Sequence, residues 1–233
     1  MTERLTEDEI VVRQVMDLGK PPFRQTDPRE AVYIFQPTES GFASIPLSGA
    51  KLRPGQTKLE SAYQYIADGK PVPPSCIPAS FDVQPVERNM PDFYYWRNCE
   101  IIVSSRARQL LEELVPNAIQ YIEIKLNIDR RMNPADGYYY INVLPSARTI
   151  DWEASASISP TQPNMDHKVV SIGSGDRSVK FKSRGLHDPL LWHELNLDSE
   201  HLVEQGRVLM RGDLWVVLDR KFPGQLDPSF RWA

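Results

Sequence analysis

Residues 100–115 read EIIVSSRARQLLEELV, and this stretch decides the expected fold because its periodicity changes part-way along. An apolar run comes first and ends in Ser104 and Ser105, either of which can cap a helix by accepting a hydrogen bond from a free backbone N–H. Beyond the serines, apolar residues recur at the spacing of one helical face, at positions 107, 110, 111, 114 and 115. The sequence therefore predicts a short strand followed directly by an amphipathic helix.

The next segment predicts a β-hairpin. Apolar and charged side chains alternate over residues 122–126, a period of two that suits a half-buried strand. Residues 133–137 read NPADG, which is turn chemistry because proline fixes one φ angle and glycine tolerates a positive one. An aromatic and β-branched run follows at 138–144. We expect these two strands to pair antiparallel, with the helix lying across them.

Weaker patterns outside this stretch add further elements. A capping box formed by Thr57 and Glu60 predicts a short helix that ends at Gly69. The other expected elements are a strand at 31–35, a hairpin of strands at 167–172 and 179–182, one or two helical turns carrying Leu202 and Val203, and a buried central strand at 214–218. Together they predict an α+β fold in which a few short helices cover an antiparallel sheet.

Proline is frequent in the N-terminal half. The chain of 233 residues contains 20 prolines, which cluster at 21–46 and 71–91. Aromatic residues interleaved with them favour ordered loops over disorder. The second cluster is either a polyproline ligand or a connector that runs over the surface, and the connector is the simpler interpretation. We expect a proline-rich α+β region over residues 1–91, packed on a domain formed by residues 92–233.

Composition narrows the class of partner and the compartment. A net charge of −4 provides no broad positive field, so the sequence predicts no nucleic-acid binding. No apolar segment is long enough to span a membrane, and the N-terminus lacks the pattern of a signal peptide, so a cytoplasmic protein is expected. Cys76 and Cys99 are too few for a disulfide framework, and free thiols are expected.

The chain shows no recognisable catalytic constellation. His193 and Glu194 suggest a metalloprotease, but a zinc-binding helix would need a second histidine where Leu197 stands, so no metal and no cofactor are expected. Asp151 and Glu153 would face the same way on a strand and are either an acid–base pair or, by the simpler interpretation, a solvated or capping pair. The lack of a catalytic pattern favours a binding protein over an enzyme.

Three motifs, in this order, resemble a known family. Residues 102–114 (IVSSRARQLLEEL), 137–144 (GYYYINVL) and 150–155 (IDWEAS) are similar to the immunity proteins of bacterial polymorphic toxin systems, a family typified by a myxobacterial member and once classed as a domain of unknown function. Residues 182–186 and 212–216 extend the resemblance, which covers roughly 93–218. It implies a protein that binds and neutralises a toxin, and it transfers no catalytic residue.

Physical reasoning adds expectations for the mode of action and for particular residues, of which the resemblance marks Asn142, Asp151, Trp152, Glu153 and Ser155 only as typical of the family. We expect stoichiometric occlusion of a cognate toxin's active cleft, with Asn142 and Ser155 satisfying buried backbone groups and Trp152 packing on the hairpin. Two alternatives stay open: an enzyme that uses Asp151, Glu153 and a histidine, and a structural module that assembles with itself as a homodimer. The residues expected to be exposed and to contact the partner are Tyr94, Trp96, Glu112, Glu113, Asp151 and Glu153.

Overall fold

The structure is a computed structural model of the chain, and its description covers two compact units. The first unit draws on Met1–Phe35, Pro145–Lys221 and Pro228–Ala233, and the second on Gln36–Leu144 and Phe222–Asp227. The division expected between residues 91 and 92 falls inside the second unit. The residues that the structure describes are 29–37, 47–62, 65–66, 69–83, 91–95, 100–127, 137–151, 153–155, 168–170, 179–183, 188–194, 201–203, 208–228 and 231–232.

The second unit is built on a six-stranded sheet with the order β2-β3-β6-β7-β5-β4. Only the β3–β6 pair in it is parallel, and the other neighbouring strands run antiparallel. The expected hairpin is confirmed, because β6 and β7 pair antiparallel with Ile122 opposite Tyr140. The strands are β2 (Leu47–Lys51), β3 (Ser80–Val83), β4 (Phe93–Tyr95), β5 (Ile101–Ser104), β6 (Ile119–Asn127) and β7 (Tyr138–Val143).

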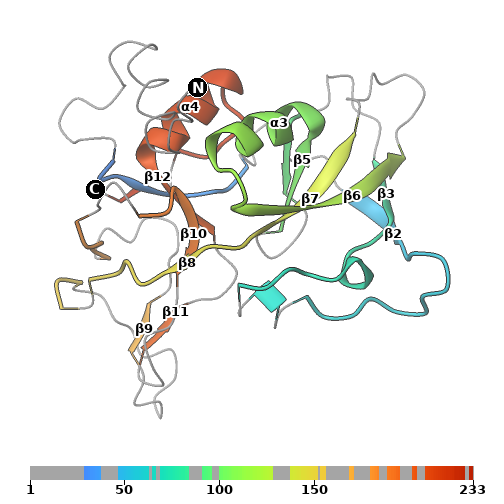
Figure 1. Cartoon of the computed structure of the whole chain (residues 1–233), viewed down its shortest axis with the longest axis horizontal. Helices are drawn as coiled ribbons and strands as arrows, with labels where there is room; N and C mark the ends of the chain where they lie inside the picture. The colour runs from blue at the N-terminus through green and yellow to red at the C-terminus, as the bar shows by residue number, and fades with distance from the viewer. Residues whose placement is uncertain are drawn as a thin grey trace, which may run out of the picture. The chain divides into compact units, whose positions relative to one another are not determined.

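Helix α3 (Ser105–Leu114) lies over β5 and β7, as Figure 1 shows, and the expected amphipathic helix is confirmed. Ser104 is the cap, since its hydroxyl accepts a hydrogen bond from the Ala107 N–H at 3.1 Å. Ala107, Leu111 and Leu114 are buried, in keeping with the predicted apolar face. The α+β class expected from the sequence is confirmed, with sheets that are mainly antiparallel.

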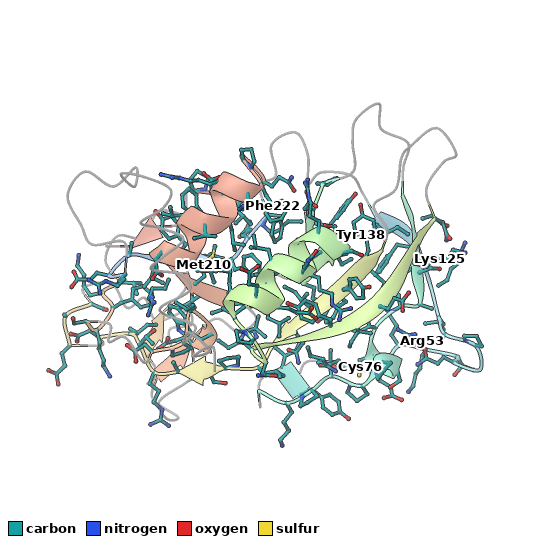
Figure 2. The ribbon with its side chains drawn as sticks, turned by 45° about the horizontal axis from the view of Figure 1, so that its top comes forward. Arg53, Cys76, Lys125, Tyr138, Met210 and Phe222 are labelled. Carbon is teal, nitrogen blue, oxygen red and sulfur yellow. The ribbon has the colours of Figure 1, made fainter. Side chains whose placement is uncertain are left out.

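The opposite face of this sheet is covered by the proline-rich segment. Val72, Cys76 and Ile77 are buried in one apolar cluster with Tyr138 and Tyr140 of β7. Figure 2 labels Cys76 and Tyr138, and the 3₁₀ helix η1 (Pro74–Cys76) carries the cysteine. The expectation of a surface connector is wrong for this segment, because three of its side chains supply core surface between the prolines.

Two amides hold the backbone of the proline-rich segment. The side chain of Gln120 accepts from the Val72 N–H at 2.7 Å and donates to the Val72 carbonyl at 2.9 Å. Asn142 donates to the Lys70 carbonyl at 3.0 Å and to the Gln120 oxygen at 3.2 Å. Since proline has no N–H, such a segment cannot build a regular ladder, and side-chain amides take that place. The expectation that Asn142 satisfies buried backbone is confirmed.

The helix expected to begin at the Thr57–Glu60 capping box begins later. Tyr65 and Ile66 are helical, and the Ile66 N–H donates to the Ala62 carbonyl at 3.1 Å. Glu60 instead accepts a hydrogen bond from the Ser75 hydroxyl at 3.0 Å. Its carboxylate therefore contacts the 3₁₀ helix η1 and does not form the expected capping box. Gly69 does end the helix, with a positive φ of 62°.

The first unit contains a five-stranded sheet with the order β13-β1-β12-β10-β8 and a separate parallel pair, β9 and β11. The expected strand at 31–35 is confirmed as β1, which pairs antiparallel with β12. An apolar cluster that includes Trp192 and Leu209 packs on this sheet. The elements are β1 (Val32–Ile34), β8 (Ser146–Ala147), β9 (Lys168–Val170), β10 (Leu191–Glu194), β11 (His201–Val203), β12 (Val208–Arg211), β13 (Arg231–Trp232) and helix α4 (Gly212–Lys221).

Three expectations for the C-terminal third are wrong. Residues 214–218 form the middle of α4 and are buried on all sides, so their unbroken apolar pattern could not reveal a helical period. Leu202 and Val203 belong to β11, not to a helical turn. β9 pairs with β11, while Phe181 bridges to Ile150, so the expected hairpin between the 167–172 and 179–182 runs is absent from the described residues.

Neither α3 nor α4 has the length and apolar character needed to cross a membrane, and this holds for every helix in the part of the chain that the structure describes.

Candidate partner-binding surface

The outer side of α3 and the adjoining hairpin bring four side chains together: Arg108, Glu112, Tyr121 and Tyr139. The Arg108 guanidinium carbon lies 5.0 Å from the ring centroid of Tyr121 and 4.4 Å from that of Tyr139. The two rings meet edge to face, with their centroids 6.3 Å apart. Arg108 Nε donates to Glu112 Oε1 at 2.8 Å. We call these four residues the Arg108 cluster.

Strand register explains why the cluster forms. Glu123 of β6 pairs with Tyr139 of β7, so Tyr121, two residues before Glu123, is the diagonal neighbour of Tyr139 on the same face. Tyr138 and Tyr140 point to the other face, into the core, because side chains alternate along a strand. Arg108 and Glu112 are four residues apart on α3 and therefore share one side of the helix.

Electrostatics fix the protonation of two members of the cluster, Arg108 and Tyr121. The hydrogen bond that Arg108 donates to Glu112 raises the pKa of Arg108 further above its usual value, so the guanidinium is charged at every physiological pH. Burial, and then the charge of Glu112, raises the pKa of the Tyr121 phenol, which stays neutral and keeps its proton. The Tyr121 hydroxyl oxygen is buried and has no hydrogen-bond partner. The cluster thus combines a permanent cation at the surface with a covered hydroxyl that has no hydrogen-bond partner.

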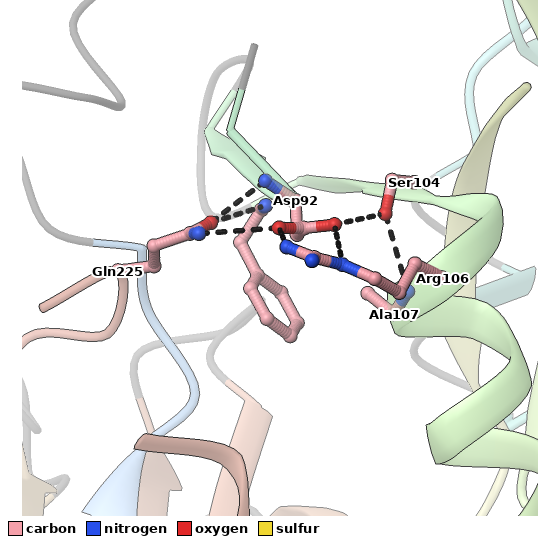
Figure 3. A network of polar contacts seen from close by, with 6 residues as sticks. Asp92, Ser104, Arg106, Ala107 and Gln225 are labelled. Carbon is pink, nitrogen blue, oxygen red and sulfur yellow. Dashed lines mark hydrogen bonds and ion pairs between the residues drawn. The ribbon is translucent and has the colours of Figure 1, made fainter. Parts of the chain in front are cut away.

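A buried carboxylate fixes the N-terminal end of α3 (Figure 3). Asp92 accepts hydrogen bonds from the Ser104 hydroxyl at 2.6 Å, from Arg106 Nε at 3.1 Å and, in an ion pair, from Arg106 Nη2. Gln225 donates to the same carboxylate at 3.2 Å, and its oxygen accepts from the N–H groups of Asp92 and Phe93. The capping serine is therefore itself held by a charge-assisted hydrogen bond, the stronger kind.

Phe222–Asp227 completes this end of the second unit. The Phe222 ring meets Phe93 edge to face with centroids 5.1 Å apart, and the Arg106 guanidinium lies 5.1 Å above the Phe222 ring. The Asp227 N–H donates to the Gln36 carbonyl at 2.9 Å. With both polar and aromatic anchors, α3 is a fixed support for the cluster on its outer side.

Three of the expected contact residues belong to this unit's described surface or core. Glu112 and Glu113 are exposed on α3, and Glu112 is part of the Arg108 cluster. The expected exposure of Tyr94 is wrong, because the side chain is 0% exposed and packs edge to face on Tyr138. An aromatic side chain on a short strand gains more from the core than from water. Trp96 lies outside the described residues.

Asp151 and Glu153 lie in the first unit, at a turn. Asp151 Oδ1 accepts a hydrogen bond from the Ala154 N–H at 3.0 Å. Asp151 therefore caps the turn, which is one of the two alternatives expected for it. The Ser155 hydroxyl donates to the Asp151 carbonyl at 2.5 Å and accepts from the Lys180 N–H at 2.9 Å, so its expected service to the backbone is confirmed. Glu153 is exposed. Trp152 lies outside the described residues.

The histidines and cysteines assemble no ligand set in the described residues. His193 is half-buried on β10, and the carboxylate of its neighbour Glu194 accepts hydrogen bonds from the backbone N–H groups of Thr149 and Ile150 and from the Trp192 indole. Glu194 therefore serves the loop after β8. Within the same described ranges, no three or more His, Cys, Asp or Glu side chains are grouped to hold a metal ion. His167, His187 and Cys99 lie outside them.

Three residues of the cluster were not expected as site residues from the sequence: Arg108, Tyr121 and Tyr139. A signal was present, since Tyr121 and Tyr139 are aromatic residues on strand positions that share a face with the charged Glu123. An aromatic side chain on the polar face of a hairpin is a candidate for recognition, because tyrosine and arginine are enriched where binding energy concentrates.

Comparison with known families gives a match over most of the chain. The model of the immunity protein family (Imm11) matches residues 33–205, which is more than half of the 233 residues. The chain belongs to this family. The resemblance is confirmed over residues 93–205, and the Imm11 match extends it towards the N-terminus and includes the whole Arg108 cluster, while residues 206–218 lie beyond the match. No curated protein matches the chain.

Proposed function

We propose that this Imm11 chain protects a bacterium from a cognate toxin of a polymorphic toxin system by binding the toxin one to one and covering its active cleft. The family match over residues 33–205 is the observation that carries this proposal. Two carboxylates that could have been catalytic, those of Asp151 and Glu194, are instead engaged in structural hydrogen bonds, which supports a binding role over an enzymatic one. Asp151 accepts from a turn N–H, and Glu194 accepts from two loop N–H groups and an indole.

We place the toxin contact on the Arg108 cluster. Its composition suits an interface centre, where tyrosine and arginine supply much of the binding energy. Its rigidity suits an inhibitor, since a surface fixed before binding loses little side-chain entropy when the partner arrives. Glu112 and Glu113 would contribute charge complementarity around the centre, which speeds encounter and excludes wrong partners.

The test is reconstitution with the toxin domain encoded by the gene adjacent to this chain's gene. Co-expression should let cells survive that toxin domain, and the purified pair should elute from size-exclusion chromatography as one complex whose mass, by light scattering, equals one copy of each. The proposal is contradicted if cells die at the same rate with and without this chain, or if the two proteins elute separately. A neighbouring gene that encodes no toxin counts against it as well.

A further inference from the structure

We propose that Arg108 is the centre of the toxin contact and that its partner there is a carboxylate of the toxin, from Asp or Glu. This inference rests on the proposed function. A guanidinium has five N–H donors, and the Nε donor of Arg108 is the one bonded to Glu112. The Nη end therefore retains donors for a second acceptor, and an arginine fork matches the two oxygens of a carboxylate.

The fork is already held in place. Tyr121 and Tyr139 lie against the guanidinium at 5.0 and 4.4 Å, and the bond to Glu112 fixes its rotation. The Arg108 side chain is still 35% exposed, so a partner can reach it. A free arginine would lose rotamer entropy on binding, whereas this one is ordered beforehand.

The helix dipole gives no reason for an arginine at position 108 of α3. A helix is stabilised by acids near its start and bases near its end, and α4 follows this rule with Asp213 in its first turn and Arg220 and Lys221 in its last. Helix α3 has no acid in its first turn and no base in its last. The buried Asp92 accounts for Arg106, but Arg108 has no buried acid to account for it.

The surroundings favour a protein carboxylate over a phosphate chain. Glu112 lies about one helical turn from Arg108 and would repel an extended polyanion. A single toxin carboxylate with basic residues beside it would pair with Arg108 and leave its basic neighbours facing Glu112. The Tyr121 hydroxyl, on a ring beneath Arg108, is buried without an acceptor. Since this hydroxyl is covered, the donors that a partner can reach here are those of Arg108, whose side chain is 35% exposed.

The experiment measures the affinity of the toxin domain encoded by the adjacent gene for the wild type and four variants. Arg108→Ala should weaken binding by more than about tenfold, and Arg108→Lys by about tenfold, since lysine keeps the charge but loses the fork and much of the stacking. Glu112→Gln should bind as tightly as wild type or more tightly, because the amide oxygen still accepts from Nε while the competing charge is gone. Arg148→Ala removes an exposed arginine in the first unit and is the matched control, expected within about twofold.

Each outcome separates this inference from the proposed function. If wild type binds and protects but Arg108→Ala stays within about twofold of it, the Arg108 contact is wrong and the proposed function stands. If Glu112→Gln weakens binding as much as Arg108→Ala, the toxin presents a base to this surface and the carboxylate is wrong. If wild type neither binds nor protects, the proposed function itself fails. Arg108→Ala should lower the melting temperature slightly, because it removes the Glu112 pair and the contacts with the two tyrosine rings. Binding is therefore compared at a temperature at which thermal melts show every variant to be folded.

Discussion

At the scale of single residues, two adjacent serines with the same local sequence signal have different roles. Ser104→Ala should lower the free energy of unfolding by about 1–2 kcal/mol, because it removes the α3 cap and a buried bond to Asp92. Ser105→Ala is the matched control and should cost less than about 0.5 kcal/mol, since its hydroxyl makes only a 3.4 Å contact with the Gly137 carbonyl. Urea denaturation measures both, and equal losses would contradict the assignment of the cap.

The thiol of Cys76 should react slowly with alkylating reagents. Burial, and then the charge of Glu60, raises the pKa of Cys76, so less thiolate is present at pH 8 than in an unfolded chain. The thiol also donates to the Ser61 carbonyl at 3.7 Å. Iodoacetamide labelling followed by peptide mass spectrometry should show slower alkylation of the Cys76 peptide in the folded protein than in concentrated urea. Equal rates in the two conditions would contradict its burial.

Residue identity alone could not place the candidate surface. Tyr94 was expected to contact the partner, yet it is a core residue, as is its neighbour Phe93. The role proposed for Arg108 depends on its contacts with Tyr121 and Tyr139, which are distant in sequence and share a face through the β6–β7 register. A contact between side chains of different helices and strands leaves no pattern in any one segment of the sequence.

At the scale of elements, periodicity in the sequence could tell a helix from a strand only where one side of the element faces water. The α3 helix and the β6–β7 hairpin were predictable because each has a polar side, and the alternation of polar and apolar residues reports the period. Helix α4 was not predictable from periodicity, since Leu214 to Leu218 are all buried. Its charges do indicate a helix, because Asp213 lies in the first turn and Arg220 and Lys221 lie in the last.

The entry to α4 contains a buried ion pair that makes a test at this scale. Arg211 and Asp213 are both buried and share two hydrogen bonds, at 2.9 and 2.8 Å. Asp213→Ala should destabilise the protein by about 3–5 kcal/mol, because it leaves the guanidinium charge buried without its acid. The double variant Arg211→Met, Asp213→Leu should recover most of that loss, as apolar groups need no partner. Urea denaturation measures both, and a double variant as unstable as the single one would contradict this explanation.

At the scale of the whole molecule, reading along the chain could not reveal how the units are composed. Each unit is assembled from separated segments, and Phe222–Asp227 returns to the second unit after the chain has built α4 in the first. This short segment lies beyond the Imm11 match at 33–205, yet its Gln225 bonds Asp92 at the base of α3. Residues outside the matched range therefore help to hold the surface on which the proposed function rests.

The central claim is that this chain neutralises a toxin by occupying it, without altering it. The most direct measurement is a titration of the adjacent gene's toxin domain with this protein, followed through the toxin's own activity under conditions of tight binding. The account predicts a linear loss of activity that ends at one molar equivalent, with full activity restored when the two proteins are separated. Loss of activity at far less than one equivalent, or lasting loss after separation, would show that this chain acts on the toxin as an enzyme and would contradict the account.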